Sequence, residues 1–306
     1  MTDAYKVAEA IYLIDAQLFS FPQYGSVYLL DESEMALVES SCTTSADFVL
    51  NGIRKLGFDP KDIHYIIVTH IHLDHAGAAG VLLKEMPQAQ VVVHQRGARH
   101  LIDPSRLESS MIKSMGEEML KTYGRVAPIA SDRVLAVEDG DLIHLSKDQQ
   151  LKVVYTPGHA PHHICIQESK NKGLFTGDAV GVYSPEEDLL IPTTPPPDIN
   201  LEIWLNTLNR LKEVPVEILY FSHFGVARKV NEILERSIQV YQLWGDIISG
   251  AMKYGGVEAA TNELKVHAAE LLEPLHNKLL YEYVVNQFVP RCAMGLVKYY
   301  QERQQS

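Results

Sequence analysis

The sequence predicts an α/β fold, in which a sandwich of β-sheets carries helices and is followed by a helical C-terminal region. Three observations support this prediction. Short strand-like runs alternate with amphipathic stretches in the first half of the chain, and strand-like runs return over residues 141–221, which is typical of sheets covered by helices. After His223 the apolar residues recur only at helical spacing. Histidine and aspartate motifs follow several of the strand-like runs, and a sandwich gathers such strand ends at one edge.

The composition is that of an ordinary soluble globular enzyme. Of the 306 residues, 46% are hydrophobic and 22% are charged, and a chain of this length can bury a full core. The formal net charge of −12, without a basic stripe, argues against a nucleic-acid partner. A small-molecule substrate is expected, and an anionic one is not excluded, because bound cations can invert the local charge.

Cysteine usage and the absence of export signals predict a cytoplasmic protein. Cys42, Cys165 and Cys292 are odd in number and widely spaced, which fits buried thiols in a reducing compartment better than disulfides. The N-terminus lacks a basic region followed by an apolar stretch, so no signal peptide is expected. No apolar run approaches the roughly 20 residues of a membrane helix, so no membrane partner is expected either.

The elements are predicted in chain order from their periodicity. Strands are expected at residues 10–18, 26–30, 35–39, 63–68, 90–94, 141–145, 151–155, 163–167, 173–176 and 216–221. Helices are expected at residues 45–56, 74–86, 97–102, 107–123 and 201–211. The run 63–68 is continuously apolar, which indicates a strand buried on both faces. The proline-rich stretch 193–198 is too stiff for a helix or a central strand.

Two regions are predicted along the chain. A catalytic domain spans residues 1–228, with a helical insertion at about 96–133. Residues 229–306 form a helical appendage with helices at 230–252, 261–272 and 275–300, and Pro274 and Pro290 break or bend its later part. This appendage forms either a cap on the site or the surface of a homodimer.

The chemical signal is concentrated in four short motifs. THIHLDH at 69–75 directly follows the apolar strand 63–68, and TPGH at 156–159, TGD at 176–178 and SH at 222–223 follow later strands. Together they supply seven candidate metal ligands, namely His70, His72, Asp74, His75, His159, Asp178 and His223.

These residue types suit a pair of metal ions. Imidazole and carboxylate are the ligands that zinc, manganese and iron prefer at neutral pH. His70 and His72 are two residues apart, so on an extended segment both face one metal. Asp74 and His75 can serve a second metal beside it. Two metals roughly 3.5–4 Å apart need a shared anionic ligand, and Asp178 suits that role. Two divalent ions are therefore predicted, with zinc favoured over iron or manganese.

Each residue also has a simpler explanation when it is considered alone. A histidine pair at a strand end can be partly exposed without a metal, and His159 or His223 is a weak signal individually. Asp178 can be an ordinary turn residue after glycine. The prediction depends on the joint pattern, because all four motifs follow strands in a consistent order.

In these motifs, and in their order across roughly residues 8–228, the chain resembles the metallo-β-lactamase superfamily, an αββα sandwich with a metal centre at one edge. Within the superfamily it is most similar to the glyoxalase II and lactonase-like branch, which keeps all seven ligands. The resemblance implies one metal on His70, His72 and His159, a second on Asp74, His75 and His223, and Asp178 as the bridge. Relatives often have glycine at the positions of His162 and Ser222, and these two departures leave the substrate open.

The resemblance implies a dinuclear metal-dependent hydrolase in which a bridging hydroxide attacks an ester, thioester or lactone, with a phosphodiester as a further candidate. Asp74 and Asp178 are expected to orient or relay the proton. Tyr183 is a candidate donor to an oxyanion, and a tyrosine packed in a loop is the equal alternative. His163 and His94 are either partners that orient a ligand or ordinary strand histidines.

Two other functions stay open. Persulfide dioxygenases share this fold, and that function would place one iron on His70, His159 and Asp178. A non-catalytic metal-binding protein is the third alternative, and the complete ligand set disfavours it. Metal identity and stoichiometry separate the first two functions, and turnover on esters, lactones or phosphodiesters separates either from the third.

Overall fold

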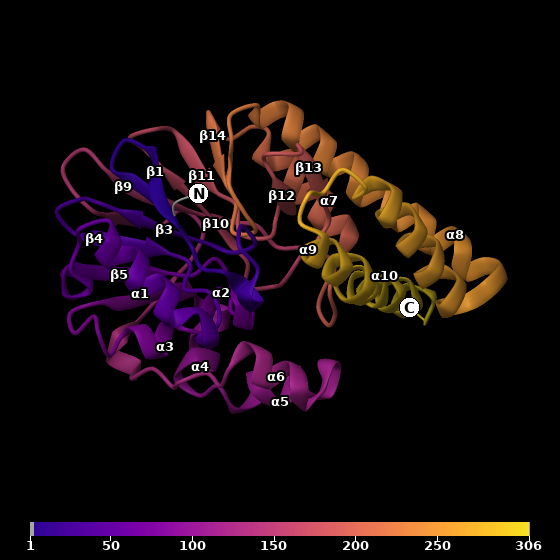
Figure 1. Ribbon diagram of the computed structural model, residues 1–306, viewed down its shortest axis with the longest axis horizontal. Helices are drawn as coiled ribbons and strands as arrows, with labels where there is room; N and C mark the ends of the chain where they lie inside the picture. Colours follow the sequence, from indigo (N-terminus) through magenta and orange to yellow (C-terminus); the bar gives the residue numbers. More distant parts are fainter. Residues whose placement is uncertain (1–2, 306) are drawn as a thin grey trace. The chain divides into compact units, whose positions relative to one another are not determined.

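The computed structural model describes residues 3–305 and forms two compact units (Figure 1). Unit 1 contains the chain through Tyr155, together with His162–Gly177 and Val216–Arg228. Unit 2 contains Thr156–Pro161, Asp178–Pro215 and the chain from Lys229 onward. The helical C-terminal region therefore forms one unit with two segments that the sequence places inside the domain 1–228.

The first sheet of unit 1 contains seven strands, which lie side by side in sequence order. They are β1 Ala4–Ala8, β2 Ile11–Asp15, β3 Ser26–Leu30, β4 Met35–Val38, β5 Ile63–Ile67, β6 Gln90–His94 and β7 Val134–Val137. The pairs from β1 to β4 are antiparallel, and those from β4 to β7 are parallel. The parallel pairing of β4 and β5 brings their carboxyl ends to one edge, so Glu39 and Thr69 emerge together there.

The second sheet of unit 1 has the strand order β15-β14-β11-β10-β9-β8. Its strands are β8 Leu142–His144, β9 Gln150–Tyr155, β10 Ile164–Glu168, β11 Gly173–Phe175, β14 Ile218–Tyr220 and β15 Val226–Ala227. Only the β11–β14 pair among these is parallel. The ends of β11 and β14 consequently lie side by side, and they lead into the TGD and SH motifs.

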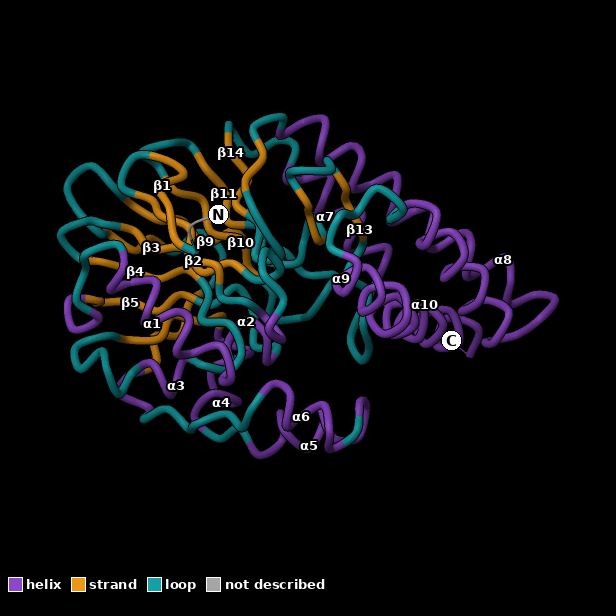
Figure 2. The backbone as a smooth tube through the Cα atoms, in the orientation of Figure 1, coloured by secondary structure: helices purple, strands orange, loops and turns teal. Residues whose placement is uncertain are grey.

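Helices of unit 1 lie on one side of the first sheet, where Figure 2 shows α1, α3 and α4 beneath the strands. The α-helices are α1 Ala46–Lys55, α2 Leu73–Ala76, α3 Ala79–Leu82, α4 Gln95–Ile102, α5 Ser105–Met115 and α6 Glu117–Tyr123. Short 3₁₀ turns accompany them at η1 Leu18–Ser20, η2 Thr43–Ser45, η3 Pro60–Asp62 and η4 Ser131–Arg133. Helix α1 buries Val49 and Ile53, four residues apart on one face, and exposes its basic last turn.

Two hydrophobic cores separate the layers of unit 1. Strand β3 shows the division, because successive side chains of a strand point to opposite faces. Val27 and Leu29 pack with residues of α1 and α3, whereas Tyr28 and Leu30 pack with residues of the second sheet such as Val153. The layered arrangement confirms the predicted α/β sandwich.

Unit 2 consists of one hairpin and several helices. Its elements are β12 Val182–Ser184, β13 Leu189–Ile191, α7 Leu201–Leu211, α8 Val230–Leu271, α9 Lys278–Tyr283, the π-helix η5 Val284–Phe288 and α10 Val289–Gln305. Figure 1 shows α8 and α10 running alongside each other. Helix α8 is two helical arms joined by a kink at Gly256, whose φ of 65° and ψ of −154° are not helical.

The structure differs from the predicted elements at several places. The helix predicted at 74–86 is divided into α2 and α3, because the Ala78 N–H donates to Ser41 O at 3.0 Å instead of continuing the helical ladder. The prediction also omits β1, β7, β12, β13 and β15, which are strands of only two to five residues.

The prediction for buried thiols is consistent with the structure, since Cys42, Cys165 and Cys292 are all buried and unbridged. Among the described residues, no helix combines the length and the apolar character that crossing a membrane requires.

Candidate metal centre

The THIHLDH motif follows β5 as a short bent loop and then enters α2 Leu73–Ala76. His72 has φ −61° and ψ 152° and precedes α2, so Asp74 and His75 lie in the first turn of that helix. His70 Nε2 and His72 Nδ1 are 3.0 Å apart, and the two rings meet edge to face with centroids 4.5 Å apart. The loop between β5 and α2 thus brings the two imidazoles together, and their binding of one metal stays a prediction.

Glycine at position 177 is required by the crowding beside this motif. Gly177 has φ +52°, and a Cβ atom there would lie 2.5 Å from His163 Nε2 and 2.7 Å from Thr69 Oγ1. A larger residue at this position would therefore clash with His163 and Thr69 within unit 1.

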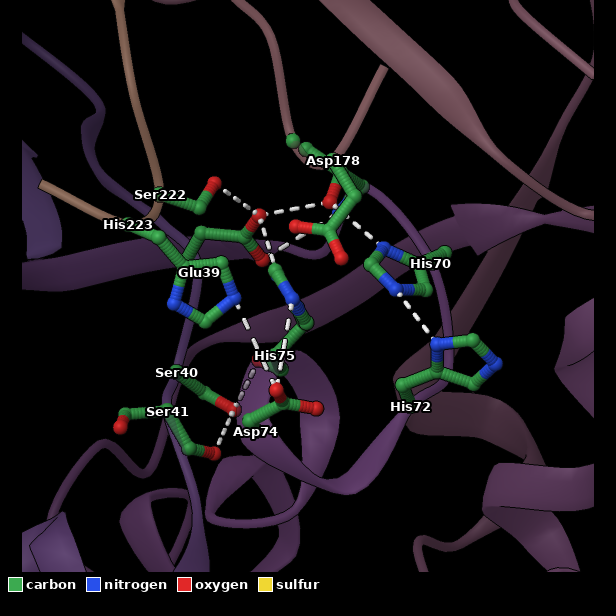
Figure 3. A network of polar contacts seen from close by, with 12 residues as sticks. Glu39, Ser40, Ser41, His70, His72, Asp74, His75, Asp178, Ser222 and His223 are labelled. Atoms are coloured by element: carbon green, nitrogen blue, oxygen red, sulfur yellow. Dashed lines mark hydrogen bonds and ion pairs between the residues drawn. The ribbon is translucent and has the colours of Figure 1, made fainter. Parts of the chain in front are cut away.

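A buried carboxylate, Glu39, organises the unit 1 part of the centre (Figure 3). Its Oε1 accepts hydrogen bonds from Thr69 Oγ1 at 2.6 Å and from Ser222 Oγ at 2.8 Å, and it lies 3.0 Å from His75 Nδ1. Glu39 itself follows β4, whereas Thr69 follows β5, Ser222 follows β14 and His75 lies in α2. The carboxylate holds the Nδ1–H of His75, so Nε2 is the nitrogen that can bind a metal.

His223 is held in the same way by a backbone group. Its Nδ1 donates to Tyr24 O at 3.2 Å, and a carbonyl oxygen can only accept, so the proton is on Nδ1. Its Nε2 lies 3.6 Å from Asp74 Oδ2, and His75 Nε2 lies 3.9 Å from the same oxygen. Asp74, His75 and His223 each offer a ligand atom within 4.8 Å of the others.

Unit 2 contains the two remaining candidate ligands, His159 and Asp178, both buried. His159 Nδ1 donates to Thr193 O at 3.1 Å, and His159 Nε2 lies 3.4 Å from Asp178 Oδ2. The imidazole also meets the Trp204 ring edge to face, with centroids 5.2 Å apart. Gly158 has φ +138°, and a Cβ atom there would lie 2.4 Å from Trp204 Cα, which explains the glycine of the TPGH motif.

The donor set fits a divalent metal ion. In His75, His159 and His223 the protein binds Nδ1, which leaves Nε2 facing a carboxylate at 3.4–3.9 Å. Two ligands of a tetrahedral zinc ion, each about 2.0–2.1 Å from the metal, lie roughly 3.3 Å apart. These nitrogen–oxygen separations therefore suit ligands that share one cation, and the partners on Nδ1 are those that metal-binding histidines commonly have.

The other predicted residues have different surroundings. Tyr183 donates from its hydroxyl to Asp188 Oδ1 at 3.0 Å, and burial together with this carboxylate raises the pKa of Tyr183 to about 12. His94 accepts from Arg96 N at 3.2 Å and stacks on Tyr155, which is a structural role at the start of α4. His163 is buried with its ring centroid 5.0 Å from that of His70, so a role beside a ligand stays a prediction.

Sequence reasoning missed Glu39 and Thr193 as partners of ligands. One signal was present for Glu39, namely a carboxylate at the end of the apolar strand run 35–39, a position that burial makes costly without partners. No comparable signal marks Thr193, because its role depends on where its backbone carbonyl lies.

The chain belongs to the metallo-β-lactamase superfamily, whose sequence model matches residues 21–223. Among curated proteins it is similar to a metallo-β-lactamase fold-containing protein of Sulfurisphaera tokodaii, with 29% identity over 72% of this chain and 81% of the relative. It is also similar to an N-acyl homoserine lactonase of a Bacillus species, with 25% identity over 59% of this chain. The match spans 63% of that lactonase, which is less than two thirds of its length.

Solved structures agree with this assignment. An archaeal superfamily protein from Sulfolobus tokodaii superimposes with a TM-score of 0.64 and 27% identity, over 75% of this chain and 85% of that one. A metallo-β-lactamase family protein from Thermus thermophilus reaches a TM-score of 0.71 over 98% of this chain and 95% of that one. Its 21% identity shows a common fold alone, and the match extends that fold through the helical C-terminal region.

Proposed function

We propose that the protein is a dinuclear metal-dependent hydrolase. One observation supports this most strongly, namely that three histidines have Nδ1 bound by the protein and Nε2 within 3.4–3.9 Å of an aspartate oxygen. Ordinary buried histidines would use such carboxylates as hydrogen-bond acceptors at about 2.8–3.0 Å. The longer separations favour a cation between the donors.

The ligands divide between two ions in this proposal. One ion is bound by His70, His72 and His159 and the other by Asp74, His75 and His223, with Asp178 as their shared ligand. We thus also propose that the five candidate ligands of unit 1 bind the same two ions as His159 and Asp178 of unit 2. Two such ions would supply a nucleophile from water at neutral pH and polarise the bond to be cleaved, and zinc suits the mixture of imidazole and carboxylate.

The two aspartates differ in the tasks they can perform. The Asp74 side chain is 21% exposed, so it can exchange a proton with solvent water while its Oδ2 faces His75 and His223. The Asp178 side chain is only 5% exposed. We assign Asp74 the proton transfer and Asp178 the orientation of the reacting groups.

The proposed substrate is a small ester, thioester or lactone, with a phosphodiester as the next class to test. Support comes from relatives that are named as N-acyl homoserine lactonases, including one from Agrobacterium fabrum that is 31% identical over 46% of this chain and 50% of its own length. No serine or cysteine nucleophile is needed, and the buried Cys165 is assigned to the core.

Metal analysis of the protein as purified, followed by hydrolysis assays on an ester, thioester, lactone and phosphodiester panel, tests this function. We expect about two metal ions per chain in the wild type and fewer in His75→Ala, with activity lost in that variant. His144→Ala is the matched control, because His144 is exposed on β8, and it should retain both metals and activity. One iron per chain with oxygen uptake on a persulfide would instead support the dioxygenase alternative.

A further inference from the structure

Thr193 is the common partner of both candidate metal ligands in unit 2. Its backbone carbonyl accepts the Nδ1–H of His159 at 3.1 Å, and its Oγ1 donates to the backbone carbonyl of Asp178 at 3.1 Å. Thr193 is 1% exposed and directly follows Pro192 after the end of β13. A single residue therefore orients the imidazole of one ligand and fixes the backbone of the other.

Thr193 is in turn held by Tyr241, which lies on the first arm of α8. The Thr193 N–H donates to Tyr241 Oη at 3.1 Å, and this hydroxyl also lies 3.3 Å from Thr193 Oγ1 and 3.4 Å from Asp178 O. Tyr241 is fully buried, so water does not compete for these contacts. The hydroxyl group meets three polar atoms on the segments that carry the ligands.

An aromatic contact completes the arrangement. The Trp204 ring packs against Tyr241 with centroids 4.5 Å apart and against the His159 ring at 5.2 Å. Trp204 Nε1 also donates to the backbone carbonyl of Ala179 at 2.7 Å, one residue after Asp178. Loss of the Tyr241 hydroxyl alone would leave this packing in place, which makes its polar contribution separable.

We propose that Thr193 and Tyr241 are positioning residues that set the affinity of the metal centre through His159 and Asp178. The helical region 230–252 would then be part of the machinery that forms the metal site, in addition to covering hydrophobic surface. This inference rests on the proposed metal centre, because it assigns Thr193 and Tyr241 a task only if His159 and Asp178 bind metal.

The expected order of effects follows from these contacts. His159 is assigned to one ion and Asp178 to both, so the ion shared with His70 and His72 should lose affinity most. Removing a hydrogen-bonding partner behind a metal ligand commonly lowers metal affinity about 10–100-fold. The Tyr241 contacts are long and indirect, so Tyr241→Phe should lie near the lower end of that range.

The test is metal binding to the metal-free protein, measured with Co²⁺ and Zn²⁺ in competition with a chelator. Tyr241→Phe and Thr193→Val are compared with the wild type, and Thr193→Ser is the conservative variant that keeps the hydroxyl. Tyr220→Phe is the matched control, because Tyr220 is also a buried tyrosine, and its hydroxyl lies 3.4 Å from Glu168 and not beside a ligand. Thermal unfolding of each metal-free variant is recorded in parallel.

We expect Tyr241→Phe and Thr193→Val to weaken the binding of one ion about ten-fold and to change the Co²⁺ absorption bands. Thr193→Ser should restore the wild-type affinity, and Tyr220→Phe should bind as the wild type does even if its thermal stability falls. If Tyr241→Phe does not fold, Thr193→Val and Thr193→Ser decide the question.

The two proposals fail in different ways. A wild type that binds no metal would overturn the metal centre and this inference together. A wild type that binds two ions, with unchanged affinities and spectra in Tyr241→Phe and Thr193→Val, would overturn the positioning role alone. Equal weakening in Tyr220→Phe and Tyr241→Phe would assign the effect to general loss of stability, which also contradicts the positioning role.

Discussion

The candidate ligands of unit 1 and those of unit 2 are held by different kinds of group. In unit 1, the Glu39 carboxylate binds His75 and joins it to Thr69 and Ser222. In unit 2, a backbone carbonyl orients His159, and its position depends on packing against α7 and α8. A buried carboxylate concentrates several bonds on one side chain, whereas backbone support is spread over many contacts. The two parts should therefore respond differently to mutation.

The largest effect is expected when the unit 1 carboxylate is removed. Glu39→Ala leaves the buried donors of Thr69, His75 and Ser222 without their acceptor, and such losses cost about 3–5 kcal/mol of unfolding free energy. Urea unfolding of the metal-free protein measures the change. Glu39→Gln keeps the volume and one acceptor oxygen, so it should lose less. If the unfolding free energy of Glu39→Ala lies within about 1 kcal/mol of the wild-type value, the three hydrogen bonds to Glu39 do not stabilise the fold as proposed.

A smaller effect is expected from crowding in unit 2. Gly158→Ala would place a Cβ atom 2.4 Å from Trp204 Cα at φ +138°, so we expect about 2–3 kcal/mol of destabilisation and weaker metal binding. Gly140→Ala is the control, because Gly140 has φ +88° and open space around the new Cβ, and it should cost about 1 kcal/mol. If the two variants lose the same stability, the positive φ alone accounts for glycine at position 158, and the close approach of Trp204 does not contribute.

The smallest effect is expected at Tyr183. Its hydroxyl donates to Asp188, which also pairs with Arg236, so Tyr183→Phe should cost about 1 kcal/mol of stability and change kcat less than three-fold. A kcat lowered about 100-fold or more at unchanged KM would instead support Tyr183 as the oxyanion donor.

The pH dependence of stability gives a second measurement on Tyr183. Its folded-state pKa is raised to about 12 from the usual 10, so the folded protein favours the neutral hydroxyl. The contribution of the neutral Tyr183 hydroxyl to the free energy of unfolding is therefore fully present below pH 10 and is lost as the pH rises towards 12. Tyr183→Phe should lack this loss, and identical alkaline unfolding curves for variant and wild type would contradict the assignment.

The sequence alone predicted the superfamily, the α/β sandwich and most strands, because these depend on local patterns. The strand run 26–30 is reproduced without change as β3, and 35–39 and 63–68 are each reproduced with one residue fewer. The seven candidate ligands were also recognisable, because the HxHxDH spacing and the strand-end motifs carry their chemistry within a few residues. Whether all seven bind two ions stays a prediction.

Only the tertiary structure identified the residues that hydrogen-bond to the candidate ligands. Glu39 and Ser222 are 183 positions apart in sequence and meet because β4, β5 and β14 end near one another. Thr193 and Tyr241 are 48 positions apart and meet because β13 leads onto the buried face of α8. Hydrophobic periodicity determines which face of an element is buried, but not which distant element covers that face. Residue types and their spacing therefore indicated the chemistry of the candidate site. The packing of distant segments decided which groups orient the candidate ligand side chains.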